Sequence, residues 1–155
     1  VGIDCQDTTR DARFAIRRLA ARDPQRAAAA ESELAAVVGP GMDVLRHVDV
    51  VKSLELARLD ACVAALARLR LDLEGDSLGA MAALRAQQGL ECFRPEAKDA
   101  TAEHDTPEPY LLRDRFMAEN ILAEAPQKAA FWGHNIHVLG GVLRGNMEGY
   151  RPTGS

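Results

Sequence analysis

The chain has 155 residues, of which 47% are hydrophobic, 27% are charged and only 5% are aromatic, and its formal net charge is −4. One domain of this size can bury a core, and the low aromatic content with abundant alanine favours closely packed helices over a β-sandwich. The acidic balance argues against a nucleic-acid partner, and no apolar run approaches the roughly 20 residues that cross a bilayer.

The three cysteines are Cys5, Cys62 and Cys92. They are odd in number, widely spaced and form no C-x-x-C motif, which predicts reduced thiols and a cytoplasmic location. Cys62 and Cys92 fall in apolar patterns with helical spacing and are predicted to be core residues. Cys5 follows Asp4, whose charge raises a thiol pKa, so none of the three is a predicted nucleophile.

The first half of the chain predicts two helices. Thr8 or Thr9 is suited to cap the first helix, because a threonine hydroxyl accepts a hydrogen bond from the backbone of the first turn. Asp23 and Pro24 then predict a helix start, with aspartate as the cap and proline at the first helical position. The second helix is predicted to reach about Val38, before a Gly-Pro-Gly stop.

Three further helices are predicted downstream. Residues 42–73 predict one long helix, or two with a break near residue 49, ended by Gly75, and Leu69 and Leu71 are predicted to widen its apolar stripe. Asp76 and Ser77 are predicted to cap the next helix, which runs to about residue 92, and the breaker-rich span 94–109 is predicted to be a loop. A last helix is predicted over residues 110–124.

Two short strands are also predicted, at residues 1–4 and 128–133. The second is a short apolar run bounded by helix breakers, which is typical of a buried strand. Polar residues just past the end of such a strand lie where open α/β sheets bind their ligands.

Two of the four histidines, His134 and His137, follow this second strand and flank Asn135. If the chain turns at Gly133, both imidazoles can face one cleft, where histidine serves as general acid, general base or metal ligand. The alternative interpretation is structural, with one histidine at the surface and the other hydrogen-bonded to the backbone.

A zinc site is a third interpretation of the histidine pair. Zinc enzymes commonly use two histidines and a carboxylate, and Glu119, Asp4 or Glu148 could supply the carboxylate. No helical H-E-x-x-H motif is present, so the pattern gives this interpretation little support.

The helix at 110–124 places Arg113, Met117 and Asn120 on one face. Arg113 and Asn120 could point toward the histidines, where an arginine can bind a carboxylate or stabilise an oxyanion. Arg115 and Glu119 are four residues apart, and the simplest interpretation is a surface ion pair.

The motifs resemble the erythromycin esterase family. Three segments carry the resemblance: residues 113–120 (RDRFMAEN), residues 132–138 (WGHNIHV) and residues 2–7 (GIDCQD). The first two are similar to the family's RDxxMAEN helix and W-(A/G)-H-N-x-H-V motif, in the same order and at close spacing. The glycine-rich residues 145–155 resemble the loop that follows.

The resemblance implies a hydrolase that cleaves an ester or lactone with water and without a cofactor or metal. Members that inactivate macrolide antibiotics open a lactone ring. By their positions in the motifs, His134 and His137 would be the active-site histidines and Asn135 would orient the loop. Arg113, Glu119 and Asn120 would support substrate binding.

One element of the family pattern is missing. The G-E-x-x-H segment, whose histidine is thought to activate the water in the family, does not occur in this sequence. We therefore interpret the chain as a partial domain, and we expect little or no esterase activity from it alone.

The expected fold class is mainly α with short β-strands, a part of an α/β esterase domain with a helical bundle and the edge of a central sheet. One partial domain over residues 1–155 is expected: a strand end and turn at 1–7, helices at 8–93, and helix, strand and active-site loop at 110–155. The expected partner is a small-molecule ester or lactone, with no nucleic acid or membrane partner. A metal-dependent hydrolase and a non-catalytic helical binding module are the alternatives.

Overall fold

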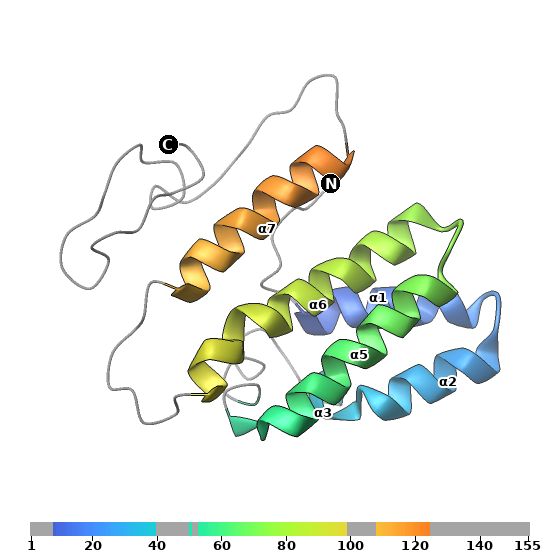
Figure 1. Cartoon of the computed structure of the whole chain (residues 1–155). Coiled ribbons are helices and arrows are strands. Elements are labelled where there is room, and N and C mark those ends of the chain that lie inside the picture. The colour runs from blue at the N-terminus through green and yellow to red at the C-terminus, as the bar shows by residue number, and fades with distance from the viewer. Residues whose placement is uncertain (1–7, 40–49, 51–52, 99–107, 125–155) are drawn as a thin grey trace.

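The computed structural model describes residues 8–39, 50, 53–98 and 108–124. Every secondary-structure element within these ranges is a helix (Figure 1). The helices are α1 (Thr8–Ala20), α2 (Pro24–Glu33), α3 (Ala35–Val38), α5 (Leu56–Asp72), α6 (Ser77–Lys98) and α7 (Glu108–Glu124).

The predicted fold class requires correction. We expected short strands at the edge of a central sheet, but the described part of the chain is a helical bundle without a strand. Its apolar residues recur at helical spacing, so each segment buries one side against other helices, and no segment shows the alternation that a sheet requires. The two predicted strands, at 1–4 and 128–133, lie outside the described residues.

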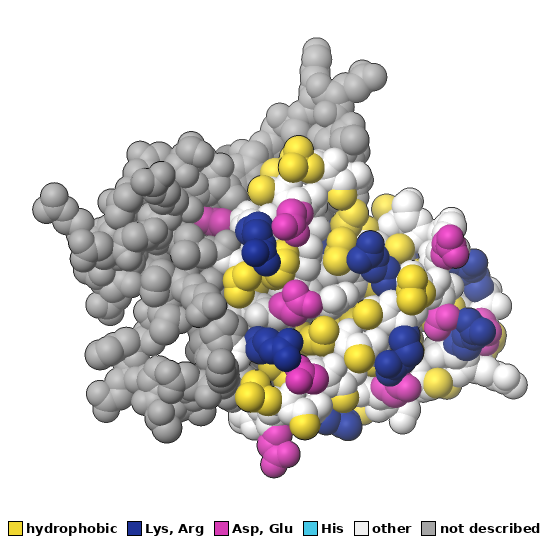
Figure 2. Space-filling model, viewed as in Figure 1, with side chains coloured by type: hydrophobic (Ala, Val, Ile, Leu, Met, Phe, Trp, Pro, Cys, Tyr) yellow, Lys and Arg dark blue, Asp and Glu magenta, His cyan; other side chains and the backbone are white. Residues whose placement is uncertain are grey.

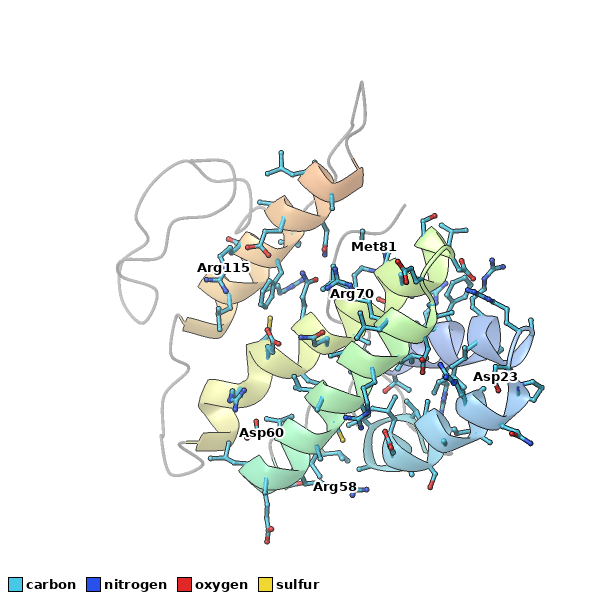
Figure 3. All side chains as sticks on the ribbon, turned by 45° about the vertical axis from the view of Figure 1, so that its right-hand side comes forward. Asp23, Arg58, Asp60, Arg70, Met81 and Arg115 are labelled. Carbon is cyan, nitrogen blue, oxygen red and sulfur yellow. The ribbon has the colours of Figure 1, made fainter. Side chains whose placement is uncertain are left out.

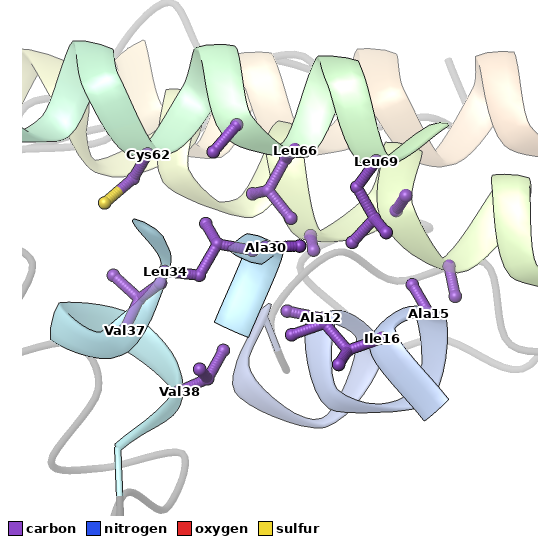
Figure 4. Packing of buried hydrophobic residues seen from close by; sticks show 14 of the residues in the cluster. Ala12, Ala15, Ile16, Ala30, Leu34, Val37, Val38, Cys62, Leu66 and Leu69 are labelled. Carbon is purple, nitrogen blue, oxygen red and sulfur yellow. The ribbon is translucent and has the colours of Figure 1, made fainter. Parts of the chain in front are cut away.

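One continuous core joins α1, α2, α3, α5 and α6. Figure 4 shows Leu66 and Leu69 of α5 directed toward Leu34, Ala30 and the buried side of α1. Small side chains line the contact between α1 and α6, which lets the two helix axes approach closely. These residues, all 0% exposed, are Ala12, Ala15, Ala82, Ala83 and Ala86.

The predicted helix caps at Asp23 and Asp76 are confirmed. The Asp23 carboxylate accepts a hydrogen bond from the backbone N–H of Arg26 at 3.0 Å, and Pro24 occupies the first helical position. After α5, Gly75 has a φ of +84°, which glycine adopts without strain. Asp76 then accepts a hydrogen bond from the N–H of Gly79 at 3.1 Å, at the start of α6.

Several boundaries and one buried position differ from the prediction. The helix from Pro24 ends at Glu33, and Leu34, with φ −94° and ψ 6°, separates it from α3 while its side chain is fully buried in the core. Helix α6 continues past Cys92 to Lys98, through Pro95. Leu71, predicted to be part of the buried stripe of α5, is 74% exposed, because only one side of α5 contacts other helices.

The predicted threonine caps are wrong. Thr8 and Thr9 are both buried residues within α1. The Thr9 hydroxyl donates a hydrogen bond to the carbonyl of Val37 at 2.8 Å and so ties α1 to the end of α3. The Arg13 guanidinium donates to the Val38 and Gly39 carbonyls at 2.5 to 3.0 Å, which satisfies the C-terminal end of α3.

Two ion pairs show that α1 and α6 are antiparallel. Asp11 accepts two hydrogen bonds from Arg85, at 2.9 and 3.1 Å, and Arg18 pairs with Asp76 at 2.7 Å. The hydrogen bond from Arg18, followed by that from the Gly79 N–H, lowers the pKa of the Asp76 carboxyl from its usual value. Elsewhere on the surface, acidic and basic side chains intermingle (Figure 2).

No described helix combines the length and the apolar composition that a membrane-spanning helix requires.

Candidate active site

The predicted site residues divide into two groups. Arg113, Glu119 and Asn120 belong to α7. His134, Asn135 and His137 lie outside the described residues, as do the other two histidines. The structure therefore places the helix that precedes the histidine motif. The convergence of the two groups on one cleft stays a prediction.

Among the predicted site residues that the structure describes, Asn120 is the most buried, with 1% of its surface exposed. Its side-chain N–H donates a hydrogen bond to the Oε1 atom of Gln88 on α6, at 2.9 Å. Gln88 is 3% exposed, so the two amides meet inside the protein and not at its surface. Asn120 thus joins α7 to the neighbouring helix.

The predicted grouping of Arg113, Met117 and Asn120 agrees with their burial. Met117 is 4% exposed and Arg113 is half-buried. Close to this side of α7, Phe116 joins Cys92 and Leu112 in a small apolar cluster between α6 and α7. This side of α7 therefore faces the bundle.

Glu119 occupies a different position. Its carboxylate lies 3.6 Å from the Arg115 guanidinium, and both side chains are more than half exposed, at 54% and 61%. Arg115 projects from α7 (Figure 3). Its guanidinium also lies over the Phe116 ring, 5.2 Å from the ring centre. The surface ion pair predicted from the sequence is present, and Glu119 does not share the buried environment of Asn120.

Sequence reasoning assigned no role to two buried polar residues, Gln88 and Asp114. Gln88 precedes Cys92 by four residues, so both lie on the side of α6 that faces α7. This helical spacing was the one signal in the sequence that could have indicated the burial of Gln88. Asp114 is 3% exposed, which is rare for a carboxylate, because a buried charge requires polar partners in the protein.

The described helices offer no group of three histidine, cysteine, aspartate or glutamate side chains that could hold a metal ion. Of the three carboxylates considered as the third zinc ligand, only Glu119 is described, and it is paired with Arg115. Asp4 and Glu148 lie outside the described residues, so the metal alternative stays a hypothesis.

Buried polar side chains gather at one level of the bundle. Asp11 lies opposite Arg85 and the two helices are antiparallel, so Thr8, three residues earlier, lies level with Gln88, three residues later. Asn120 joins this level through its hydrogen bond to Gln88. Of the five buried polar residues in the described ranges, only Asp114 lies elsewhere; the others are Thr8, Thr9, Gln88 and Asn120.

We call this group of four residues the polar layer. The Thr8 hydroxyl is fully buried, and no hydrogen-bond partner for it exists among the residues that the structure describes. A buried hydroxyl without a partner reduces the free energy of unfolding, because it has lost its hydrogen bonds to water.

Two of the helices that contribute to the polar layer, α1 and α7, neighbour motif-bearing segments in the sequence. Residues 2–7 immediately precede Thr8, and α7 ends four residues after Asn120, about 6 Å further along its axis. Figure 1 shows α6 between α1 and α7. Helix α6 thus links α1, which follows the GIDCQD segment in the sequence, to α7, which precedes the WGHNIHV segment.

A family model described as erythromycin esterase matches residues 1–151. The chain belongs to the erythromycin esterase family. The match includes residues 2–7, 113–120 and 132–138, and it confirms the resemblance that these three motifs indicated. Comparison with curated proteins and with solved structures gave no match.

Proposed function

We propose that this erythromycin esterase family chain carries part of the active site of a hydrolase that cleaves an ester or lactone with water. The family match over residues 1–151 carries the proposal, because it spans the histidine motif and the helix before it. The expected substrate is a small-molecule ester or lactone, and a macrolide is one candidate. The reduced state expected of the cysteines supports action in the cytoplasm.

In the proposed reaction, a base takes a proton from water and the oxygen attacks the carbonyl carbon of the substrate. The tetrahedral oxyanion then collapses, the C–O bond to the alkoxide breaks, and the alkoxide takes up a proton. His134 and His137 are proposed to hold and deliver these protons, since imidazole titrates near neutral pH.

The remaining predicted residues have supporting roles in this proposal. Asn135 orients the loop between the histidines, and Arg113 offers a cation that can stabilise the oxyanion. Asn120 supports the end of α7 from inside the protein through Gln88. Glu119 contributes least, because its carboxylate is paired with Arg115 on the surface.

The absence of a G-E-x-x-H segment shapes the test of this proposal. We expect little turnover from these 155 residues alone, and full turnover when a polypeptide with such a segment completes the site. The assay should therefore compare this chain with the whole protein translated from its start codon.

The experiment measures hydrolysis of a panel of small chromogenic esters and of a macrolide lactone by the whole protein. His134→Ala and His137→Ala should each lower kcat by roughly 100-fold or more, the usual contribution of a general acid or base. His104→Ala is the matched control, because it removes a histidine outside the motif, and it should retain wild-type turnover.

The outcomes separate the three hypotheses. Turnover that survives both motif substitutions would overturn the proposal. Turnover that a chelator abolishes and zinc restores would favour the metal-dependent alternative. A fully folded whole protein without turnover, in which both substitutions lower only stability, would favour the non-catalytic binding module.

A further inference from the structure

Helix α7 contacts the rest of the described bundle mainly through α6. Two features of this contact are described by the side chains that form them. One is the small apolar cluster of Leu112, Phe116 and Cys92, and the other is the hydrogen bond between the buried amides of Asn120 and Gln88. The side of α6 that faces α7 is therefore chemically unlike the side that faces α1 and α5, which is lined by alanine and leucine.

The two features differ in how strongly they fix the position of α7. An apolar cluster loses little when a helix slides or rotates slightly, because the hydrophobic effect has no preferred direction. A buried amide pair requires a donor and an acceptor within about 3 Å, and a shift of one helical turn, about 5.4 Å, would leave both amides buried without this partner. Single buried polar pairs set helix register in this way elsewhere.

We propose that Gln88 is a positioning residue of the hydrolase, which sets the register of α7 on α6 by accepting the hydrogen bond from Asn120. This inference rests on the proposed function. The register of α7 determines where Arg113 lies and from which point the chain continues toward His134 and His137. Gln88 itself stays buried, at 3% exposure, and does not contact substrate.

The neighbouring glutamine provides a matched control. Gln87 lies next to Gln88 on the same helix, but its side chain donates to Glu91 of the same helix at 2.9 Å. Gln87→Leu and Gln88→Leu are the same chemical change, and only the second removes the link to α7. An effect specific to Gln88 therefore reports the contact with α7 and not the composition of α6.

Cys92 provides a measurement that does not depend on activity. Cys92 is 5% exposed and lies in the cluster with Phe116, so displacement of α7 should uncover its thiol. Cys62 is 0% exposed within the main core and serves as the internal reference. The labelling experiment uses a Cys5→Ser background, so that two thiols remain in these 155 residues.

In the whole protein, Gln88→Leu should lower kcat about tenfold and leave KM within about twofold, because misplaced groups impair the chemical step more than binding. It should also raise the rate of Cys92 labelling by about tenfold and leave the Cys62 rate unchanged. Gln87→Leu should match the wild type in all four measurements.

An exchange of the two amides tests the pair directly. Gln88→Asn shortens one side chain by one methylene, and Asn120→Gln lengthens the other by one. Each single substitution should lower kcat and expose Cys92, and the double substitution should restore both toward wild-type values. A purely additive double variant would contradict a direct link.

Failure of this inference and failure of the proposed function give different results. If the wild type is active and Gln88→Leu behaves like Gln87→Leu, the positioning role is overturned while the hydrolase stands. If the wild type has no turnover, NMR spectra of the histidine rings decide. If the His134 and His137 signals shift in Gln88→Leu but not in Gln87→Leu, the positioning role of Gln88 is supported. If they are unchanged in Gln88→Leu, that role is overturned.

Discussion

The two sides of α6 are held to their neighbours by different interactions. Toward α1 and α5, α6 presents alanine and leucine side chains to a continuous apolar core. Toward α7 it presents Gln88 and Cys92, and the contact combines an amide pair with a small apolar cluster. The first side supplies most of the buried apolar area and hence most of the stability, whereas the second carries the buried hydrogen bond between Asn120 and Gln88.

The largest expected effect comes from weakening the main core. Leu66 is fully buried, so Leu66→Ala should reduce the free energy of unfolding by about 2 to 5 kcal/mol. Urea denaturation followed by circular dichroism measures this loss. Leu71→Ala, at a position that is 74% exposed, is the control and should stay within about 0.5 kcal/mol of wild type. Equal losses in the two variants would contradict the described core.

The thiols should distinguish the two sides of α6 in the native protein. Burial raises the pKa of the Cys62 thiol, which makes its reactive thiolate scarcer at neutral pH. Cys62 should react with a thiol reagent only when the bundle unfolds, whereas Cys92 should react when α7 alone detaches, at least about tenfold faster. Mass spectrometry of the labelled peptides measures both rates, and equal rates would show that α7 and the bundle open together.

A third effect concerns the contact between α1 and α6 at acid pH. The pKa of Asp76 is lowered in the folded protein, first by the Arg18 hydrogen bond and then by the Gly79 N–H. The stabilisation is therefore present above the ordinary carboxyl pKa of about 3.9 and is lost as the pH falls through the lower folded-state value.

Asp76→Asn tests this pH dependence, because asparagine keeps a helix cap but cannot ionise. Unfolding by urea at a series of pH values should show a smaller loss of stability below about pH 4 in the variant than in the wild type. The comparison with Asp60→Asn, a change at an exposed carboxylate of α5, shows whether the effect is specific to Asp76.

The smallest expected effect lies on the outer side of α7. Glu119→Gln removes the charge that pairs with Arg115, and an exposed pair of this spacing contributes only about 0.3 to 0.5 kcal/mol. We expect a similarly small change in stability and at most a twofold change in kcat. A loss of kcat comparable to that of His134→Ala would show instead that Glu119 acts in the site.

The sequence predicted the parts of the bundle that depend on neighbouring residues. The helix starts at Asp23–Pro24 and Asp76 and the turn at Gly75 follow from local backbone chemistry, and the structure confirms them. The burial of Cys62 and Cys92 followed from helical spacing. The order and spacing of the three motifs were sufficient to indicate the family, which the match over residues 1–151 confirms.

Local patterns were less informative where a distant contact decides the outcome. Pro95 suggested the end of a helix, yet α6 continues to Lys98. Leu71 fitted the apolar stripe but is exposed, since the stripe indicates which residues are apolar and not how wide the contact is. The expected strands were inferred from short apolar runs, a signal that leaves strand and helix ambiguous, and the described chain is helical.

By itself, then, the sequence determined most helix-forming segments, the caps at Asp23 and Asp76 and the family, because each depends on residues close together in the chain or on the order of the motifs. Only the tertiary structure decided that Asn120 is paired with Gln88 while Glu119 faces solvent with Arg115. These two neighbours belong to one motif, but a helix turns by 100° between them. Which of the two sides meets α6 is settled by the packing of residues far apart in the sequence.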